Sequence, residues 1–169
     1  MLQELQQPGY AHVLINHVPI IGAVLGLIAL LVGLFFKQRA ALMPALVILF
    51  IAGISVWPVY ETGEAAYKPI RKIAGDPGSD WLDEHMDRAD RAAWLFFVLA
   101  GLSAAAIAAP FRWPKAGVPL ALAAGIAAVA CAGAGVWIAQ PGGLVRHTEF
   151  RLPNVTPPGE QETTHTHEH

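Results

Sequence analysis

The stretch VPIIGAVLGLIALLVGLFF, from Val18 to Phe36, contains no charged or polar side chain. As a helix it would be ~28 Å long, which is enough to cross the hydrocarbon core of a bilayer. Three more stretches of this kind follow, at residues 41–60, 92–109 and 117–139. A chain of 169 residues cannot bury four helices that are apolar on every side, because its core is too small. The sequence therefore predicts four transmembrane helices.

The composition is that of a membrane protein, because only 14% of the residues are charged and 54% are apolar, whereas soluble domains have ~25% charged residues. The stretches do not alternate apolar with polar residues, which excludes a transmembrane β-barrel. We expect isolated polar residues such as Ser55 and Ser103 to bond back to their own helices. Met1 to Gly9 lack the basic residues of a cleaved signal peptide, so we expect the first helix to be retained. Cys131 is the only cysteine, and no disulfide is expected.

The short connections between the helices indicate their orientation. Residues 37–40 and 110–116 contain no acid, and their basic residues are Lys37, Arg39, Arg112 and Lys115. Basic residues concentrate in cytoplasmic loops. We therefore predict an all-α, up-down-up-down four-helix bundle in a bacterial inner (cytoplasmic) membrane, with both termini on the periplasmic side.

The long connection, residues 61–91, would then lie on the periplasmic side. Within it, Gly75-Asp76-Pro77-Gly78 is a strong breaker between two helix-compatible stretches. We therefore expect an extramembrane helical hairpin between the second and third transmembrane helices. We also expect Pro141-Gly142-Gly143 to end the fourth helix. The transmembrane domain would cover residues 1–151, and a disordered tail containing Pro and His residues would cover 152–169.

Small residues line two of the predicted helices. Gly22 and Gly26 form a small-x-x-x-small pair on the first, and the fourth carries a stripe made of Ala121, Gly125, Ala128, Ala132 and Gly135. Such residues let helices approach closely in lipid. We expect them to pack the bundle against itself rather than to form a homodimer.

The predicted topology brings polar residues from distant parts of the sequence to one end of the bundle. The periplasmic ends of the four helices carry His12, His17, Glu61, Glu64, His85 and His147. The first and third helices of an up-down bundle are diagonal neighbours, and a b-type haem requires facing histidines on such helices. His12 or His17 would then pair with His85. Together with Glu61 or Glu64, the same histidines would instead suit zinc, copper or iron.

The same end of the bundle also has an interpretation without a cofactor. Histidines at a membrane interface are amphipathic, and carboxylates outside the lipid are solvated. A partner protein would find an acidic docking surface at Asp80, Asp83, Glu84, Asp87 and Asp90. The chain has no phosphate-binding glycine loop, nucleophilic triad or nucleic-acid-binding pattern, which excludes conventional hydrolases, kinases and DNA-binding proteins.

Four short motifs, taken in order, resemble an uncharacterised family of predicted bacterial four-helix membrane proteins called domain of unknown function 2231. They are His12-Val-Leu-Ile-Asn-His17-Val-Pro19-Ile, Thr62-Gly63-Glu64-Ala65, the single residue His85, and Gly142-Gly143-Leu144-Val145-Arg146-His147. The chain departs from the family pattern at Val13, Val18 and Arg146. The resemblance implies the four-helix architecture and the set of histidines, and it implies no reaction.

Three functions remain open at this point. The leading hypothesis is a small membrane redox subunit that binds haem b or another metal (Fe, Cu or Zn) at the outer face and passes electrons to other membrane or periplasmic subunits or to quinone. The first alternative is a non-catalytic anchor or assembly subunit that docks a partner through residues 61–91, and the second is a metal-handling membrane protein. We expect an electron-transfer or accessory subunit rather than a stand-alone enzyme.

Overall fold

The computed structural model describes residues 6–37, 39–147 and 150–151, and the predicted tail at 152–169 lies outside them. Over the described residues the chain is helical and contains no strand. The α-helices are α1 (Pro8–Ile15), α2 (Val18–Phe35), α3 (Arg39–Ile54), α4 (Val56–Ala74), α5 (Asp76–Ala92), α6 (Trp94–Ala108) and α7 (Gly117–Arg146). Two short 3₁₀ turns, η1 (Ala109–Phe111) and η2 (Pro114–Ala116), connect α6 to α7.

The four predicted apolar stretches are helical, and each forms part of a longer helical segment. Breaks at Asn16–His17, Ser55 and Ala93 separate α1 from α2, α3 from α4 and α5 from α6. Across these breaks the chain forms four long helical segments, each of which contains a window long and apolar enough to cross a membrane. These segments are Pro8–Phe35, Ala40–Ala74, Asp76–Phe111 and Pro114–Arg146.

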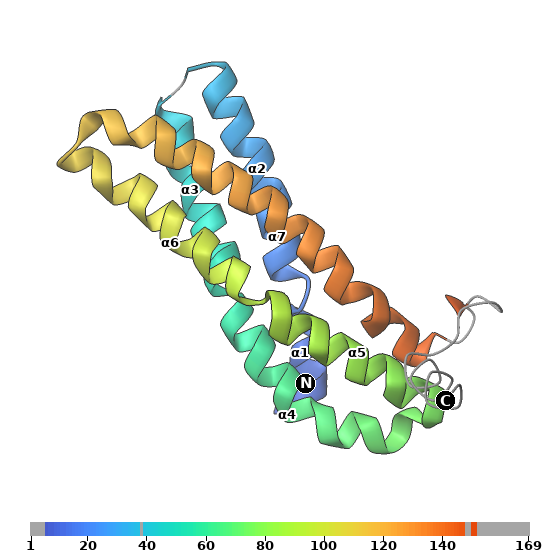
Figure 1. Ribbon diagram of the computed structural model, residues 1–169. Coiled ribbons are helices and arrows are strands. Elements are labelled where there is room, and N and C mark those ends of the chain that lie inside the picture. Colours follow the sequence, from blue (N-terminus) through green and yellow to red (C-terminus); the bar gives the residue numbers. More distant parts are fainter. Residues whose placement is uncertain (1–5, 38, 148–149, 152–169) are drawn as a thin grey trace, which may run out of the picture.

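The apolar helices α2, α3, α6 and α7 form a closed ring in which each helix packs on two others (Figure 1). Their contacts run α2–α3, α3–α6, α6–α7 and α7–α2, so that α2 and α6 lie on opposite corners. Glycines set the close approaches: a Cβ on Gly26 would lie 2.6 Å from Leu49, and one on Gly53 would lie 2.6 Å from the carbonyl oxygen of Phe96. The small residues of α2 and α7 therefore pack inside the bundle, as the sequence predicts.

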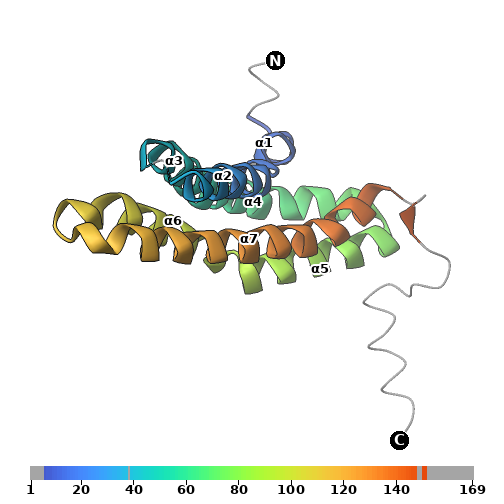
Figure 2. The ribbon, with the colours of Figure 1, turned by 90° about the horizontal axis from the view of Figure 1, so that it is seen from above.

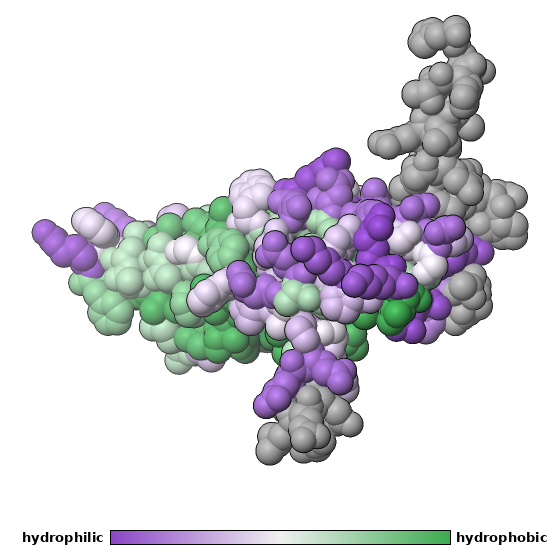
Figure 3. All heavy atoms as spheres, turned by 90° about the horizontal axis from the view of Figure 1, so that it is seen from below, coloured by the Kyte–Doolittle hydropathy of each residue, from purple (hydrophilic) through white to green (hydrophobic). Residues whose placement is uncertain are grey.

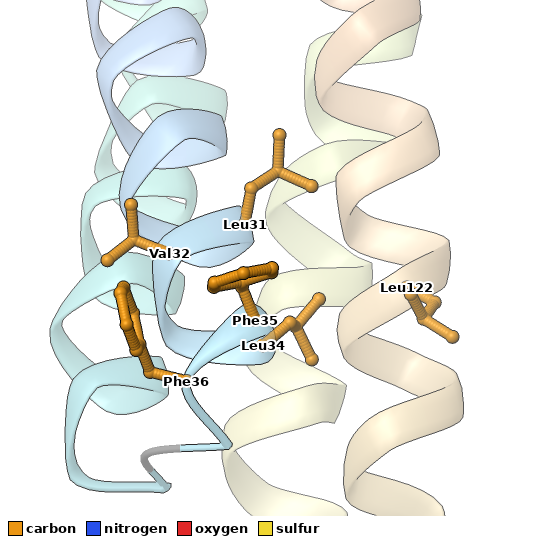
Figure 4. A pocket seen from close by; sticks show the side chains of 6 residues that line it. All are labelled: Leu31, Val32, Leu34, Phe35, Phe36 and Leu122. Carbon is orange, nitrogen blue, oxygen red and sulfur yellow. The ribbon is translucent and has the colours of Figure 1, made fainter.

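The outer surface of this ring is apolar. Large side chains such as Leu25 and Ile126 are 56% and 74% exposed, and Figure 3 shows hydrophobic surface over one half of the molecule and polar surface over the other. The exposed apolar surface includes a groove of about 650 Å³, walled only by hydrocarbon side chains of α2 and α7 (Figure 4). Such a surface requires a lipid bilayer around it.

The two predicted serine bonds have different outcomes. The hydroxyl of Ser55 donates to the carbonyl of Ala52 at 2.8 Å, as expected. The prediction for Ser103 is wrong, because its hydroxyl is fully buried in the ring and has no hydrogen-bond partner among the described residues.

The burial pattern repeats in the two halves of the chain. The buried residues Pro19, Ala23, Gly26, Leu30 and Gly33 recur with identical spacing as Ala92, Phe96, Leu99, Ser103 and Ala106. On the other helix of each half, Ala45, Leu46, Leu49, Ala52, Val56 and Ala66 recur with identical spacing as Ala124, Gly125, Ala128, Cys131, Gly135 and Val145. Figure 2 shows the first-half helices on one side of the molecule and the second-half helices on the other. Each of these buried positions therefore has a buried counterpart, and exchanging the halves preserves the ring contacts.

The prediction that Pro141-Gly142-Gly143 ends the fourth helix is wrong, since α7 continues to Arg146 with Pro141 inside it. A proline within a helix removes the N–H that the carbonyl one turn earlier would accept. That carbonyl belongs to Trp137, and the Arg88 guanidinium of α5 donates to it at 2.8 Å. The adjacent carbonyl of Ile138 accepts a bond from His85 at 2.7 Å. In α7, side chains of α5 thus donate to the carbonyls at the proline defect.

Beyond the apolar ring, α4 and α5 lie side by side and are joined by Gly75 alone. Gly75 has a φ of 70°, a backbone conformation that favours glycine. Two side-chain hydrogen bonds join the helices at different points along their length: Tyr60 donates to Asp90 and Tyr67 donates to Asp83, both at 2.6 Å. Arg71 also pairs with Asp83, at 3.0 Å. We call these cross-links the α4–α5 bonds.

Candidate functional site

His12 of α1 and His85 of α5 face each other at the polar end of the bundle. Their ring centres are 6.3 Å apart and their planes are nearly perpendicular, at 83°. The two residues are counterparts in the repeat, because His12 precedes the buried Pro19 by the same number of residues as His85 precedes its counterpart Ala92. We call them the histidine pair.

The His12 ring packs against α4. Its Nδ1 lies 2.9 Å from the carbonyl oxygen of Val59, so Nδ1 carries the proton and donates, since a carbonyl only accepts. A Cβ on Gly63, one turn further along α4, would lie 2.9 Å from Cε1 of the imidazole. Only glycine leaves room for the ring there. We call His12, the Val59 carbonyl and Gly63 the first imidazole site.

The His85 ring packs against α7 in the same manner. Its Nδ1 donates to the carbonyl of Ile138 at 2.7 Å, and a Cβ on Gly142 would lie 2.9 Å from that nitrogen. Ile138 and Gly142 are the counterparts of Val59 and Gly63 in the repeat. His85, the Ile138 carbonyl and Gly142 form the second imidazole site.

Both imidazoles are held in the neutral form. Both rings lie outside the apolar ring, on the polar half of the molecule. Burial lowers the pKa of each imidazole below 6.5, and the hydrogen bond to the carbonyl, which raises the pKa, offsets only part of this shift. For His85, the neighbouring His12 and Arg88 lower the pKa further. With the proton on Nδ1, each Nε2 keeps a lone pair, and neither Nε2 has a hydrogen-bond partner among the described residues. A neutral imidazole with an available lone pair is the form that binds metals.

The structure does not bring the other predicted ligands to the pair. His17 lies at the break between α1 and α2 with its side chain exposed, and Glu61 and Glu64 are exposed on α4. His147 is also exposed, beyond the end of α7, where its ring lies 5.1 Å from that of Phe150. Among the described residues, no three His, Cys, Asp or Glu side chains are grouped so as to hold a metal ion.

From the sequence, Gly63 and Gly142 are members of short motifs with no role assigned to either glycine, and the two carbonyls that fix the rings are not identified. The Val59 and Ile138 carbonyls carry no sequence signal. Gly63 and Gly142 do carry one, because each follows its carbonyl by one helical turn and each faces a histidine of the other helix in its hairpin. Arg88 is a further residue of this region: it bonds Glu84 at 2.6 Å and donates to the Trp137 carbonyl that Pro141 leaves without an N–H.

Comparison of the chain with protein families, with curated proteins and with solved structures finds no match.

Proposed function

We propose that this chain is a small membrane redox subunit that holds one haem b between His12 and His85. The observation that carries the proposal is the histidine pair, two neutral imidazoles each fixed through Nδ1 and each with an available Nε2 lone pair. Histidines that bind metals typically donate their other ring N–H to a carbonyl or carboxylate, which orients the ring. The two imidazole sites have this arrangement.

The number of ligands favours haem over a bare ion. Zinc sites in proteins use three or four protein ligands, and the described residues bring together a pair of histidines with no third ligand. A haem iron needs only two axial ligands from the protein, because the macrocycle supplies the rest.

The spacing of the rings is compatible with the same role. Two imidazoles that each bind a shared metal ion at ~2 Å have centres roughly 6 Å apart, against the 6.3 Å observed. The same distance also suits an edge-to-face ring contact, so the proposal rests on the fixed tautomers and the number of ligands as well.

We further propose that the chain crosses a bacterial inner membrane up-down-up-down, with the α4–α5 hairpin and the histidine pair on the periplasmic side. Two observations support this. The surface is mainly hydrophobic on one half of the molecule and mainly polar on the other, and the connections at the far end carry Lys37, Arg39, Arg112 and Lys115 without an acid. From the periplasmic side, the haem would exchange electrons with a larger complex or with quinone.

The order of the histidine and glycine motifs also leads us to propose membership of the family called domain of unknown function 2231. Gly63 and Gly142 belong to two of the motifs that carry the resemblance. Contact between these glycines and the histidine pair would give those motifs a physical reason.

The test is a visible absorption spectrum of the full chain purified in detergent, oxidised and then reduced with dithionite, together with iron, copper and zinc analysis of the same sample. We expect a Soret band that shifts and sharpens on reduction, with stoichiometric iron. His12→Ala and His85→Ala should each lose it, because each removes one axial ligand. His17→Ala is the matched control, since His17 is exposed and apart from the pair.

Other outcomes would select the alternatives. Stoichiometric zinc or copper without a Soret band would favour a metal-handling protein. Neither haem nor metal, in protein from cells supplied with both, would overturn the redox proposal and leave an anchor or assembly subunit that docks through residues 61–91.

A further inference from the structure

Over the part of the chain that the structure describes, the helices around the histidine pair form a ring that is open on one side. In the apolar half all four neighbouring pairs of helices are packed, whereas in the polar half the packed pairs are α1–α4, α4–α5 and α5–α7. The fourth pair, α7 with α1, is not packed in this way. The break at Asn16–His17 is where α1 departs from the line of α2, which still packs on α7 through Ile20 and Gly135.

The repeat shows what is missing on the open side. The α4–α5 bonds use Asp83 and Asp90, together with Tyr67 and Tyr60. In the repeat the two aspartates correspond to Tyr10 on α1 and to His17 at the break that follows it. The two tyrosines correspond to Arg146 and Ala139 on α7. The four counterparts are all exposed, and no bond joins them across α1 and α7.

From this difference we propose that the cofactor of the histidine pair reaches it sideways, between α1 and α7, and this rests on the function proposed above. The opposite side is closed by Gly75 and the α4–α5 bonds. The flanking sides are closed by the imidazoles themselves, each packed on a glycine of the neighbouring helix.

The chemistry of the open side suits a flat, mainly apolar ligand. Tyr10 and Leu14 are 47% and 59% exposed on α1, whereas the counterpart of Leu14 on the closed side is the charged Asp87. Arg146 lies at the far end of the same side, on α7, as a cation for the polar edge of such a ligand. An apolar wall with one cation at its edge matches a haem macrocycle with its carboxylates.

The test compares two counterpart positions on opposite sides, Leu14 on the open side and Asp87, which pairs with Arg91 at 2.8 Å, on the closed side. Leu14→Cys and Asp87→Cys would each be made in a Cys131→Ala background and coupled to a bulky maleimide in the cofactor-free protein. Haemin is then added, and the rise of the Soret band is followed. We expect the label at position 14 to slow loading by about tenfold or more, which corresponds to ~1.4 kcal/mol in the barrier, and the label at 87 to leave the rate within about twofold.

A second arm separates access from damage to the site. Protein loaded with haemin first and labelled at position 14 afterwards should keep its Soret band unchanged. Equal loading rates for the two labelled proteins, slower loading with the label at 87, or loss of haem from the pre-loaded protein would overturn the proposal. If the unlabelled protein shows no Soret band with haemin, the cofactor proposal fails, and the access route fails with it.

Discussion

The first imidazole site lies on an uninterrupted stretch of α4, whereas the second lies at a proline defect in α7. In α4 the Val59 carbonyl accepts a bond from the imidazole of His12, and the Thr62 hydroxyl donates to the neighbouring Pro58 carbonyl at 2.7 Å. In α7, Pro141 removes an N–H nearby, and the adjacent carbonyls are taken by His85 and Arg88. A carbonyl has two lone pairs, so a helix need not be broken to accept an imidazole. What the two sites share is the glycine one turn later, which admits the ring.

The largest effect that we expect is a loss of stability at Gly53, where helices of the two halves approach closely. Gly53 of α3 meets the backbone of α6, whereas its counterpart in α7 is Ala132. Because a Cβ at 53 would lie 2.6 Å from a backbone oxygen, Gly53→Ala should lower the free energy of unfolding by up to about 3 kcal/mol. Denaturant unfolding in detergent measures it. Gly133→Ala is the control, with no atom near its added Cβ, and equal stabilities of the two variants would contradict the prediction.

The next effect tests whether the two imidazole sites are equivalent. Gly63→Ala and Gly142→Ala should each weaken haem binding by about 10- to 100-fold, because the added methyl group displaces the ring from its carbonyl. Haemin titration followed by the Soret band gives the affinities. Gly143→Ala is the matched control, since its Cβ would meet nothing within 4 Å. A loss at one glycine only would show that the halves have diverged in function as well as in sequence.

A smaller loss of stability is expected when one of the α4–α5 bonds is removed. Tyr67→Phe removes the bond to Asp83 but leaves the ring and the Arg71–Asp83 pair. We expect a loss of about 0.5–1.5 kcal/mol in the free energy of unfolding, the usual range for one hydrogen bond. Thermal unfolding in detergent measures it. Tyr10→Phe serves as the control, because the Tyr10 hydroxyl has no hydrogen bond among the described residues, and an equal loss there would refute this account.

The most gradual effect is on the pH dependence of the cofactor-free protein. Burial lowers the pKa of His12 and His85 in the folded state, so the unfolded chain binds protons more readily below pH 6.5. Stability contributed by the pair should therefore be complete above that pH and decline as the pH falls. Unfolding curves at pH 7 and 5 measure this decline. It should be shallower in the His12→Asn, His85→Asn double variant, and an identical slope would contradict the assignment.

The sequence predicts the apolar segments well, because an uncharged stretch of this length has few alternatives to a membrane-spanning helix. It also predicts that His12 and His85 come close, since both precede diagonal helices at the same end. It could not place His17, which lies at the break between α1 and α2 with its side chain exposed. It did not place His147 either: α7 continues through Pro141 to Arg146, so that His147 lies exposed beyond the end of the helix.

The single residue between α4 and α5 has a consequence for how the two halves are rotated relative to each other. An α-helix turns by ~100° for every residue, and Gly75 allows no slack between Ala74 and Asp76. One residue inserted into α5 between Gly75 and His85 would turn His85 by more than a quarter of a turn relative to the start of that helix, and so away from His12, while leaving both helices intact. The short turn at Gly75 thus fixes where α5 starts, and the ten residues from Gly75 to His85 fix which face of α5 is presented to α1.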